Sequence, residues 1–494
     1  MQVENEKTRK VLIVGGGTAG WMTANLFAKQ LSDKGFSISL IESDNVPTVG
    51  VGEGTTPYIK RLFESLNISE QEWMPECDAT YKSGITFAEW STTPGFTQYF
   101  HPFYSQHDSE AIEAFKQITR LRHHGYDVPV HPNDYFLQAT LVKQGKLPFL
   151  QHDESGQNVY AYHFDAAKLG LYLAKVARSL GVKHIVDHVI RVNTAASGDI
   201  LSVETEHSGE IQADLFVDCT GFSAMLIGKT LGVPFHSFKD NLLNDAAVAI
   251  PTKIDNTYSP QTISTAMSNG WRWEIPLTKR KGNGYVYSSQ FQSKSSAESE
   301  LRHILGDTIL EDAQAHHVDM RVGRMDKHWH KNCVAIGLSQ GFIEPLEATA
   351  LQIVQISIEE FLTQYQRGNY TTQYQEYFNN GVNNVFEHIR DYIVLHYLTN
   401  SRAGSTYWAT CRNEIKLSDS LQAIMEVWCQ GEDLDAELKR QNITMYYSEP
   451  SWYVLLAGMG IFPSRNQNQM QTHEEANSFA RKIRGRVLDI ASHY

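Results

Sequence analysis

The chain has 494 residues, 41% of them hydrophobic and 20% charged, which is typical of a soluble globular protein with roughly two to four domain-sized units. A count of 43 lysines and arginines against 56 aspartates and glutamates gives a net charge of −13, which argues against nucleic acid and anionic membranes as partners. Five cysteines are scattered without C-x-x-C spacing, so the sequence predicts reduced thiols, a cytoplasmic location and no metal site.

We expect neither a signal peptide nor a membrane-spanning segment. The first apolar run, Val11 to Val14, has only the length of a strand and follows a charged N-terminus. The most apolar late run, Trp452 to Phe462, is interrupted by Gly458 and Gly460 and is too short to cross a bilayer.

The first predicted elements form a βαβ unit. Residues 11–14 are predicted as a buried strand, residues 21–31 as a helix and residues 37–41 as a second strand. Between the first strand and the helix, Gly15-Gly16-Gly17-Thr18-Ala19-Gly20 matches G-x-G-x-x-G, and Glu42 follows the second strand where a partner for a ribose hydroxyl is expected. This context favours a dinucleotide site, for which NAD and FAD both fit, over a merely structural glycine turn.

Two later blocks of the sequence return to the same kind of module. A helix and three strands are predicted in the first of them: 166–180, 185–192, 200–205 and 213–218. The second block adds a strand over residues 334–336 and a helix after it. Three separated pieces of the chain are therefore expected to build one nucleotide-binding module.

The stretches between these pieces, at about 76–154 and 236–324, look inserted and carry the aromatic residues and alternation of a substrate-facing sheet. From about residue 366 onward helical patterns dominate. The clearest of these patterns cover residues 374–397, 418–429 and 473–490.

The most informative stretch of the chain is Gly270-Trp271-Arg272-Trp273-Glu274-Ile275-Pro276. As a short strand it would put both tryptophan rings on one face, where such rings are usually core or lid packing. It also matches W-x-W-x-I-P, and together with the G-x-G-x-x-G loop it resembles the flavin-dependent halogenases of the tryptophan-halogenase type. The resemblance covers nearly the whole chain and is densest in residues 11–103, 161–222 and 265–360.

The resemblance implies an α/β fold, with a Rossmann-like FAD-binding module, an inserted substrate-facing sheet and a helical C-terminal subdomain. We expect the module to span residues 1–365, including the two insertions, and residues 366–494 to complete the substrate site. The chain has no second complete G-x-G-x-x-G. This agrees with halogenases that receive FADH2 by diffusion from a separate flavin reductase.

The family match assigns FAD binding chiefly to the glycine loop and to Gly50–Pro57, which resembles the family's strap near the isoalloxazine. The glycines let the backbone approach a pyrophosphate, and the following helix presents free N–H groups to it. The predicted cofactor-binding residues are Gly15, Gly17, Thr18, Ala19, Gly20, Glu42, Gly52, Glu53, Gly337 and Leu338.

Lys82 is predicted to be a catalytic residue. In a strand over residues 78–87 it shares a face with Gly84, which leaves space beside the ammonium, although on local evidence alone an ordinary solvated lysine is favoured. The pattern Glu72-Trp73-Met74…Tyr81-Lys82 resembles the segment that holds the catalytic lysine of the family. Its ammonium would hydrogen-bond and polarise hypohalous acid, or its neutral amine would form a haloamine, and the sequence leaves both open.

A second catalytic residue and a halide site are predicted where residues 341–350 lead into a helix with apolar positions at helical spacing. The first N–H groups of that helix form a natural anion site. In the resembling family this turn places a halide near the flavin. By that match Glu347 assists the lysine or accepts the ring proton, and the backbone of Thr349 and Ala350 holds the halide.

Five aromatic residues are assigned to the substrate or to its separation from the flavin. His101 and Phe103 match the ring pair that sandwiches an indole, although a surface His-Pro turn is the alternative. In the family Trp271 and Trp273 wall the flavin off from the substrate, and Trp452 offers a further ring near the C-terminus.

We therefore predict FADH2- and O2-dependent chlorination or bromination of an electron-rich, indole-type substrate, by way of a flavin hydroperoxide and hypohalous acid. The expected partners are a flavin reductase and a small aromatic molecule, and the sequence leaves a homodimer open. Two alternatives also stay open. One is a flavin-dependent aromatic monooxygenase, and the other is a catalytically degenerate flavin-binding paralogue, which is supported by alanine at 350 where the family has glycine.

Overall fold

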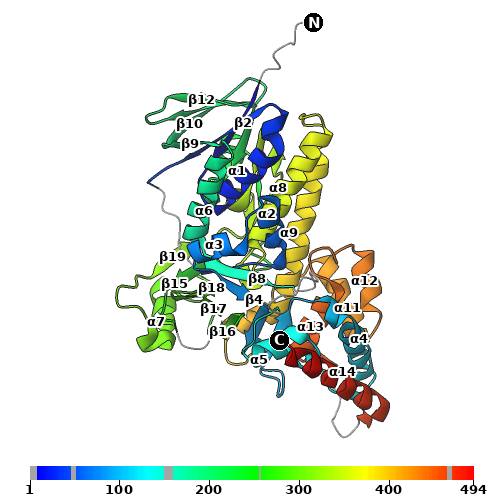
Figure 1. The fold of residues 1–494 in the computed structure, drawn as a ribbon. Helices are drawn as coiled ribbons and strands as arrows, with labels where there is room; N and C mark the ends of the chain where they lie inside the picture. Colours follow the sequence, from blue (N-terminus) through cyan, green and yellow to red (C-terminus); the bar gives the residue numbers. More distant parts are fainter. Residues whose placement is uncertain (1–7, 46–51, 150–158, 255–257, 464–469) are drawn as a thin grey trace. The chain divides into compact units, whose positions relative to one another are not determined.

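The computed structural model describes residues 8–45, 52–149, 159–254, 258–463 and 470–494 (Figure 1). The chain divides into two compact units, each made of three sequence segments. Unit 1 comprises Met1–Ala79, Phe164–Lys239 and Asp319–Glu387, and unit 2 comprises Thr80–His163, Asp240–Val318 and His388–Tyr494. The division predicted near residue 365 stays a prediction.

A six-stranded sheet forms the centre of unit 1. Its strand order is β21 (Trp329–His330), β22 (Cys333–Ala335), β13 (Leu215–Asp218), β1 (Arg9–Val14), β2 (Phe36–Glu42) and β9 (Lys183–Val186). All neighbouring strands are parallel except β21 and β22, which are antiparallel. The central strands are almost continuously apolar and buried, as expected for parallel strands covered on both faces.

One face of this sheet packs against helices. The helix α1 (Thr18–Leu31) contacts β1 and β2 and also packs against α6 (Ala166–Ser179) and α8 (Ala350–Arg367). Phe27 of α1 stacks on Phe361 of α8 with ring centroids 5.7 Å apart. The predicted βαβ unit is therefore confirmed.

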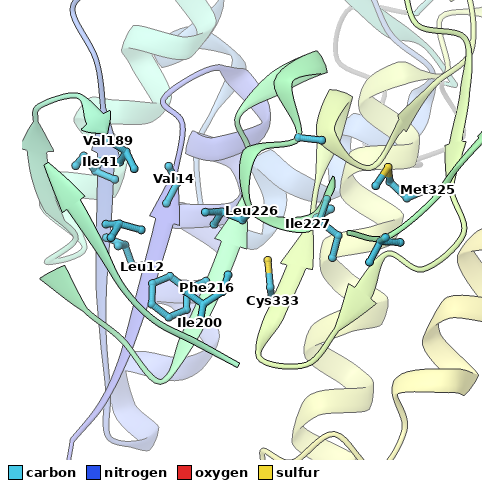
Figure 2. Close-up of a cluster of buried hydrophobic side chains, with 14 residues drawn as sticks. Leu12, Val14, Ile41, Val189, Ile200, Phe216, Leu226, Ile227, Met325 and Cys333 are labelled. Atoms are coloured by element: carbon cyan, nitrogen blue, oxygen red, sulfur yellow. The ribbon is translucent and has the colours of Figure 1, made fainter. Parts of the chain in front are cut away.

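A buried apolar cluster fills the other face of the sheet (Figure 2). Leu12 and Val14 of β1 meet Phe216 of β13 and Ile200 of a second, three-stranded sheet there. That sheet consists of β10 (Val189–Thr194), β11 (Ile200–Thr205) and β12 (Glu210–Gln212). Unit 1 also contains α2 (Lys60–Ser65), α3 (Glu70–Glu76), β3 (Gly52–Gly54) and a sheet of β14 (Phe235–Ser237), β20 (Gly323–Met325) and β23 (Gly341–Phe342).

A seven-stranded sheet forms the centre of unit 2. Its strand order is β19 (His316–Asp319), β15 (Ala246–Ala249), β18 (Lys281–Tyr287), β17 (Gly270–Pro276), β16 (Thr262–Met267), β5 (Gly84–Ala88) and β6 (Gln98–Pro102). β16 and β5 pair in parallel, whereas the pairs from β15 to β16 and the pair β5–β6 are antiparallel. The helix α7 (Lys294–Leu305) buries Leu301 and Leu305 against β15 and β18.

Two short strands, β4 (Thr80–Lys82) and β8 (Ala161–Asp165), pair antiparallel, and β7 (Tyr126–Asp127) pairs with β24 (Gln471–Thr472). The helices of the remaining chain are α4 (Ser109–His123), α5 (Leu137–Lys143), α9 (Gln375–Leu398), α10 (Thr406–Asn413), α11 (Asp419–Gln430), α12 (Leu434–Arg440), α13 (Glu449–Gly458) and α14 (Glu474–Ser492). The fold is thus the predicted α/β class with a helical C-terminal part. No helix among the described residues has the length and apolarity needed to cross a membrane.

Two predicted strands are wrong in detail. The stretch 185–192 is split between β9 and β10, which belong to different sheets, because Asp187 accepts backbone N–H bonds from His188, His207 and Ser208 and turns the chain. The stretch 78–87 is split at Ser83 into β4 and β5. The Ser83 N–H donates to Pro260 O, and Ser83 O accepts from the Phe103 N–H, so both of its backbone groups bond outside the two strands.

Candidate functional site

The predicted dinucleotide loop lies where β1 ends and α1 begins. Gly15 has a φ of 114°, and a Cβ at this position would lie 2.1 Å from Cys219 O. A Cβ at Gly20 would lie 2.0 Å from Gly15 O, so helix and loop touch at the backbone. Around Gly17, in contrast, no described residue other than its chain neighbours has an atom within 4 Å of where a Cβ would be. Glycine therefore closes the turn at two positions and leaves open space at the third.

The start of α1 can accept an anion. Gly17 is its N-cap and offers no side-chain cap, and the first intrahelical bond runs from the Trp21 N–H to Gly17 O. The N–H groups of Thr18 and Ala19 consequently have no partner within the helix. Free N–H groups beside the open space at Gly17 fit the pyrophosphate of FAD.

Glu42 ends β2 and reaches the glycine loop, as its spacing predicts. A Cβ at Gly16 would lie 1.6 Å from Glu42 Oε2, so the carboxylate lies directly over the loop. Its other oxygen, Oε1, lies 2.7 Å from Nε2 of His184 on β9. His184 also packs edge-on against Trp21. No sequence motif singled out His184, because the parallel pairing of β2 with β9 brings it there.

Gly337 and Leu338 begin a 3-10 helix, Gly337–Ser339, directly after β22. Gly337 has a φ of 75°, and a Cβ there would lie 2.7 Å from Ala19 Cβ, which places this turn against the glycine loop. Leu338 is 42% exposed. The carboxyl ends of the parallel strands thus bring together Glu42, the loop and Gly337, the place where open α/β sheets bind ligands.

The predicted strap is described only from Gly52 onward, and Gly50 and Val51 lie outside the described residues. Gly52 and Glu53 form part of β3, and Thr55 is buried after it. Burial raises the pKa of Glu53 to about 7. A carboxyl group that ionises near neutral pH is an uncommon feature outside functional sites.

The predicted halide turn is a 3-10 helix, Pro345–Glu347, followed by Ala348 with a φ of 57° and by Thr349, the N-cap of α8. The left-handed residue is Ala348, so alanine at 350 takes part in ordinary helical backbone. Glu347 and Thr349 are 4% and 3% exposed. Within the described chain the buried Thr349 hydroxyl has no hydrogen-bond partner. A buried donor beside free helix N–H groups fits a small anion.

Lys82 is fully buried in β4, with 0% of its surface exposed, so the solvated-lysine alternative is wrong. Its Nζ lies 5.6 Å from the centre of the Phe103 ring. The space predicted at Gly84 is also absent, because a Cβ there would lie 2.2 Å from His101 O. Gly84 therefore lets β6 approach β5 closely and does not open a cavity beside the lysine.

The tryptophan rings of β17 share one face, as predicted. Trp271 is buried, and its ring centroid lies 6.2 Å from that of Trp273. The Trp273 ring covers the Cα of Gly284 on β18, where a Cβ would lie 2.0 Å from the indole.

Two of the other predicted aromatic residues, His101 and Trp452, meet through Tyr392 of α9. The Tyr392 ring lies 6.0 Å from His101 and 5.0 Å from Trp452, and it stacks on Tyr447 at 3.6 Å. His101 and Trp452 are buried, so the surface His-Pro turn is excluded. Tyr392 lies within the helical pattern that predicts α9 and has no motif of its own.

The candidate residues divide between the two units. The glycine loop, Glu42, the strap and the turn at Glu347 belong to unit 1, and Lys82, the tryptophan pair and the rings around Tyr392 belong to unit 2. Within unit 1 the glycine loop, Glu42 and Gly337 lie together. Within unit 2 Lys82 lies near Phe103, and His101 and Trp452 lie beside Tyr392.

Comparison with known proteins finds halogenases along the whole chain. The family model described as "Tryptophan halogenase" matches residues 10–475. Tryptophan 6-halogenase SttH of Streptomyces toxytricini is 38% identical over 92% of this chain and 90% of its own length, and its crystal structure superposes with a TM-score of 0.86 over 98% of both chains. Tryptophan 7-halogenase RebH of Lentzea aerocolonigenes is 33% identical over 98% of this chain and 95% of its own. Xcc4156, a flavin-dependent halogenase from Xanthomonas campestris, has a TM-score of 0.84 at 32% identity, covering 99% of this chain and 96% of that one.

Proposed function

Since the chain belongs to the tryptophan halogenase family of flavin-dependent enzymes, we propose that it uses FADH2, O2 and chloride or bromide to halogenate an indole-type aromatic ring. The observation that carries the proposal is the complete burial of Lys82, 5.6 Å from the Phe103 ring. A desolvated primary amine beside an aromatic ring is suited to delivering an electrophilic halogen to an aromatic carbon. The relatives named above are halogenases, which favours halogenation over hydroxylation by an aromatic monooxygenase.

In this proposal the residues at the sheet edge of unit 1 hold FAD. The N–H groups of Thr18 and Ala19 bind the pyrophosphate, and Glu42 accepts hydrogen bonds from the adenosine ribose. When bound, the reduced flavin supplies hypohalous acid from O2 and halide. The Thr349 hydroxyl and the first N–H groups of α8 hold the halide ion, which is supported by the unpartnered, buried state of that hydroxyl among the described residues.

The halogen-transfer step is assigned to Lys82 and Glu347. The Lys82 amine holds the halogen and presents it to the electron-rich ring, and Glu347 accepts the ring proton that is lost after substitution. Trp271 and Trp273 keep the ring of the substrate away from the flavin, so that oxygen is not transferred to it directly.

We propose an indole-type substrate because the relatives carry tryptophan in their names and because unit 2 gathers buried rings around Tyr392. His101, Phe103 and Trp452 would contact the indole. A separate flavin reductase would deliver FADH2, which is supported by the single glycine fingerprint of the sequence. A homodimer and a cytoplasmic location stay predictions.

Mass spectrometry of reaction products tests this proposal. Wild type and Lys82→Ala are incubated with indole or tryptophan, FAD, a flavin reductase and NADH, with chloride or bromide. We expect a halogenated product from wild type, a loss of about 100-fold or more in the variant, and unchanged flavin oxidation. Lys439→Ala, which removes an exposed lysine of α12, is the matched control and should behave as wild type. A hydroxylated product from wild type would replace this proposal by the monooxygenase alternative.

A further inference from the structure

The buried histidine next to Lys82 has no role in the function proposed above. In the antiparallel pair of β4 and β8, Thr80 lies opposite His163 and Lys82 lies opposite Ala161. Directly opposed residues point to the same face of a sheet, so these four side chains share one face and His163 is the diagonal neighbour of Lys82. All four are buried, and His163 and Lys82 are both fully so.

Both ring nitrogens of His163 are hydrogen-bonded to threonines. Nε2 lies 2.9 Å from Thr262 Oγ1, and Nδ1 lies 3.3 Å from Thr80 Oγ1. The Thr80 hydroxyl donates its own proton to Pro276 O at 2.7 Å, so its oxygen accepts from the ring at Nδ1–H. Burial, together with the nearby charge of Lys82, holds the pKa of His163 well below its usual range. The ring is therefore neutral, with its proton on Nδ1 and with Nε2 accepting from the Thr262 hydroxyl.

Through these bonds one imidazole joins three elements. Thr80 belongs to β4, two residues before the lysine, Thr262 begins β16, and Pro276 ends β17, the strand of the tryptophan pair. The edge of β4 also depends on Tyr258, whose hydroxyl bonds to both backbone groups of Tyr81. β4 has only three residues, and Lys82 is the last of them before the break at Ser83.

We propose that His163 is a positioning residue for Lys82, which holds β4 against β16 and β17 so that the lysine amine meets the halogen in a single place. The inference rests on the proposed function, because it assumes that Lys82 delivers the halogen. A neutral ring suits this task, because a positive charge on His163 would repel a protonated Lys82 and disturb its position.

The variant pair Thr262→Val and Thr262→Ser tests the inference with little change in volume. Valine removes the hydroxyl that donates to His163 Nε2, whereas serine keeps it. His163→Asn removes the imidazole itself. If that protein does not fold, the two Thr262 variants still test the inference. Each protein is compared with wild type and Lys82→Ala for NADH-driven flavin oxidation, hypohalous acid trapped by monochlorodimedone, and halogenated indole.

We expect Thr262→Val to lower kcat for halogenated indole about tenfold with an unchanged KM, while flavin oxidation stays at the wild-type rate and trapped hypohalous acid rises. Thr262→Ser should form as much halogenated indole per flavin oxidised as wild type does. The positioning role would be overturned if Thr262→Val lost flavin oxidation and halogenated product equally. It would also be overturned if Thr262→Val and His163→Asn both kept the wild-type kcat. Undiminished halogenation by Lys82→Ala would instead overturn the proposed function, so the two failures are distinguishable.

Discussion

The glycine loop of unit 1 and the lysine segment of unit 2 are built in opposite ways. The loop is six consecutive residues, and its chemistry comes from backbone N–H groups at the start of α1. Lys82 owes its surroundings to residues far away in the sequence, because Thr80 bonds to a proline 196 residues later and to a histidine 83 residues later. Backbone sites are therefore readable from a local motif, whereas a side-chain site assembled by several strands needs the three-dimensional structure.

Both regions nevertheless depend on a glycine that permits close backbone approach. A Cβ at Gly15 would lie 2.1 Å from Cys219 O, and a Cβ at Gly84 would lie 2.2 Å from His101 O, which is too close for any side chain. Substitutions at these glycines therefore test the stability of each unit separately from its binding of FAD.

The largest effect is expected from Gly15→Ala. Alanine would meet a carbonyl oxygen 2.1 Å away and would have to adopt a φ of 114°, so we expect a loss of several kcal/mol and little soluble protein. Gly17→Ala is the matched variant, since its Cβ enters space left open by the described chain. It should fold with a wild-type melting temperature and bind FAD at least about tenfold more weakly, measured by flavin fluorescence. Unchanged FAD affinity in Gly17→Ala would place the pyrophosphate elsewhere.

A somewhat smaller effect is expected from Gly84→Ala in unit 2. Its Cβ would lie 2.2 Å from His101 O and 2.6 Å from the Phe100 ring, but its backbone is not left-handed, so only crowding opposes the change. We expect about 1–3 kcal/mol of destabilisation as β6 shifts away from β5. FAD binding should be retained because the glycine loop belongs to the other unit. Urea unfolding and an FAD titration of the same protein check both expectations, and lost FAD affinity in folded protein would contradict the second.

The same contrast explains what the sequence could predict. The strand, loop and helix around Gly15 were placed correctly because apolar runs and the glycine spacing are local signals. The predicted starts of α11 and α14 agree with the structure to within one residue, since Ser418 and His473 cap these helices, whereas α1 begins at Thr18, three residues before its predicted start.

The predictions around Lys82 were less complete. The lysine itself was found by family resemblance, but its burial, the break at Ser83 and the role of Gly84 follow from the pairing of distant strands. His163 and His184 carry no motif, because each gains its importance from a partner on a neighbouring strand.

The smallest effect concerns the buried histidines, and both units contain fully enclosed examples. In unit 1 His328 stacks on Phe386, its Nε2 lies 2.9 Å from Asn383 Oδ1, and burial lowers its pKa to about 3. In unit 2 the pKa of His163 is lowered in the same way. Each ring stays neutral in the folded chain, whereas in the unfolded chain it binds a proton below about pH 6.5.

Stability should consequently fall as the pH drops from 6.5 toward 3, because the unfolded state then binds more protons than the folded state. At pH 5.5 one such histidine weakens the fold by about 1.4 kcal/mol relative to pH 7.5. His328→Gln loses packing at every pH, but its decline in unfolding free energy between these two pH values should be smaller than that of wild type by this amount. Urea unfolding at both pH values measures the difference. An equal decline in both proteins would mean that His328 is protonated in the folded chain, and the enclosed, uncharged ring described for unit 1 would then be wrong.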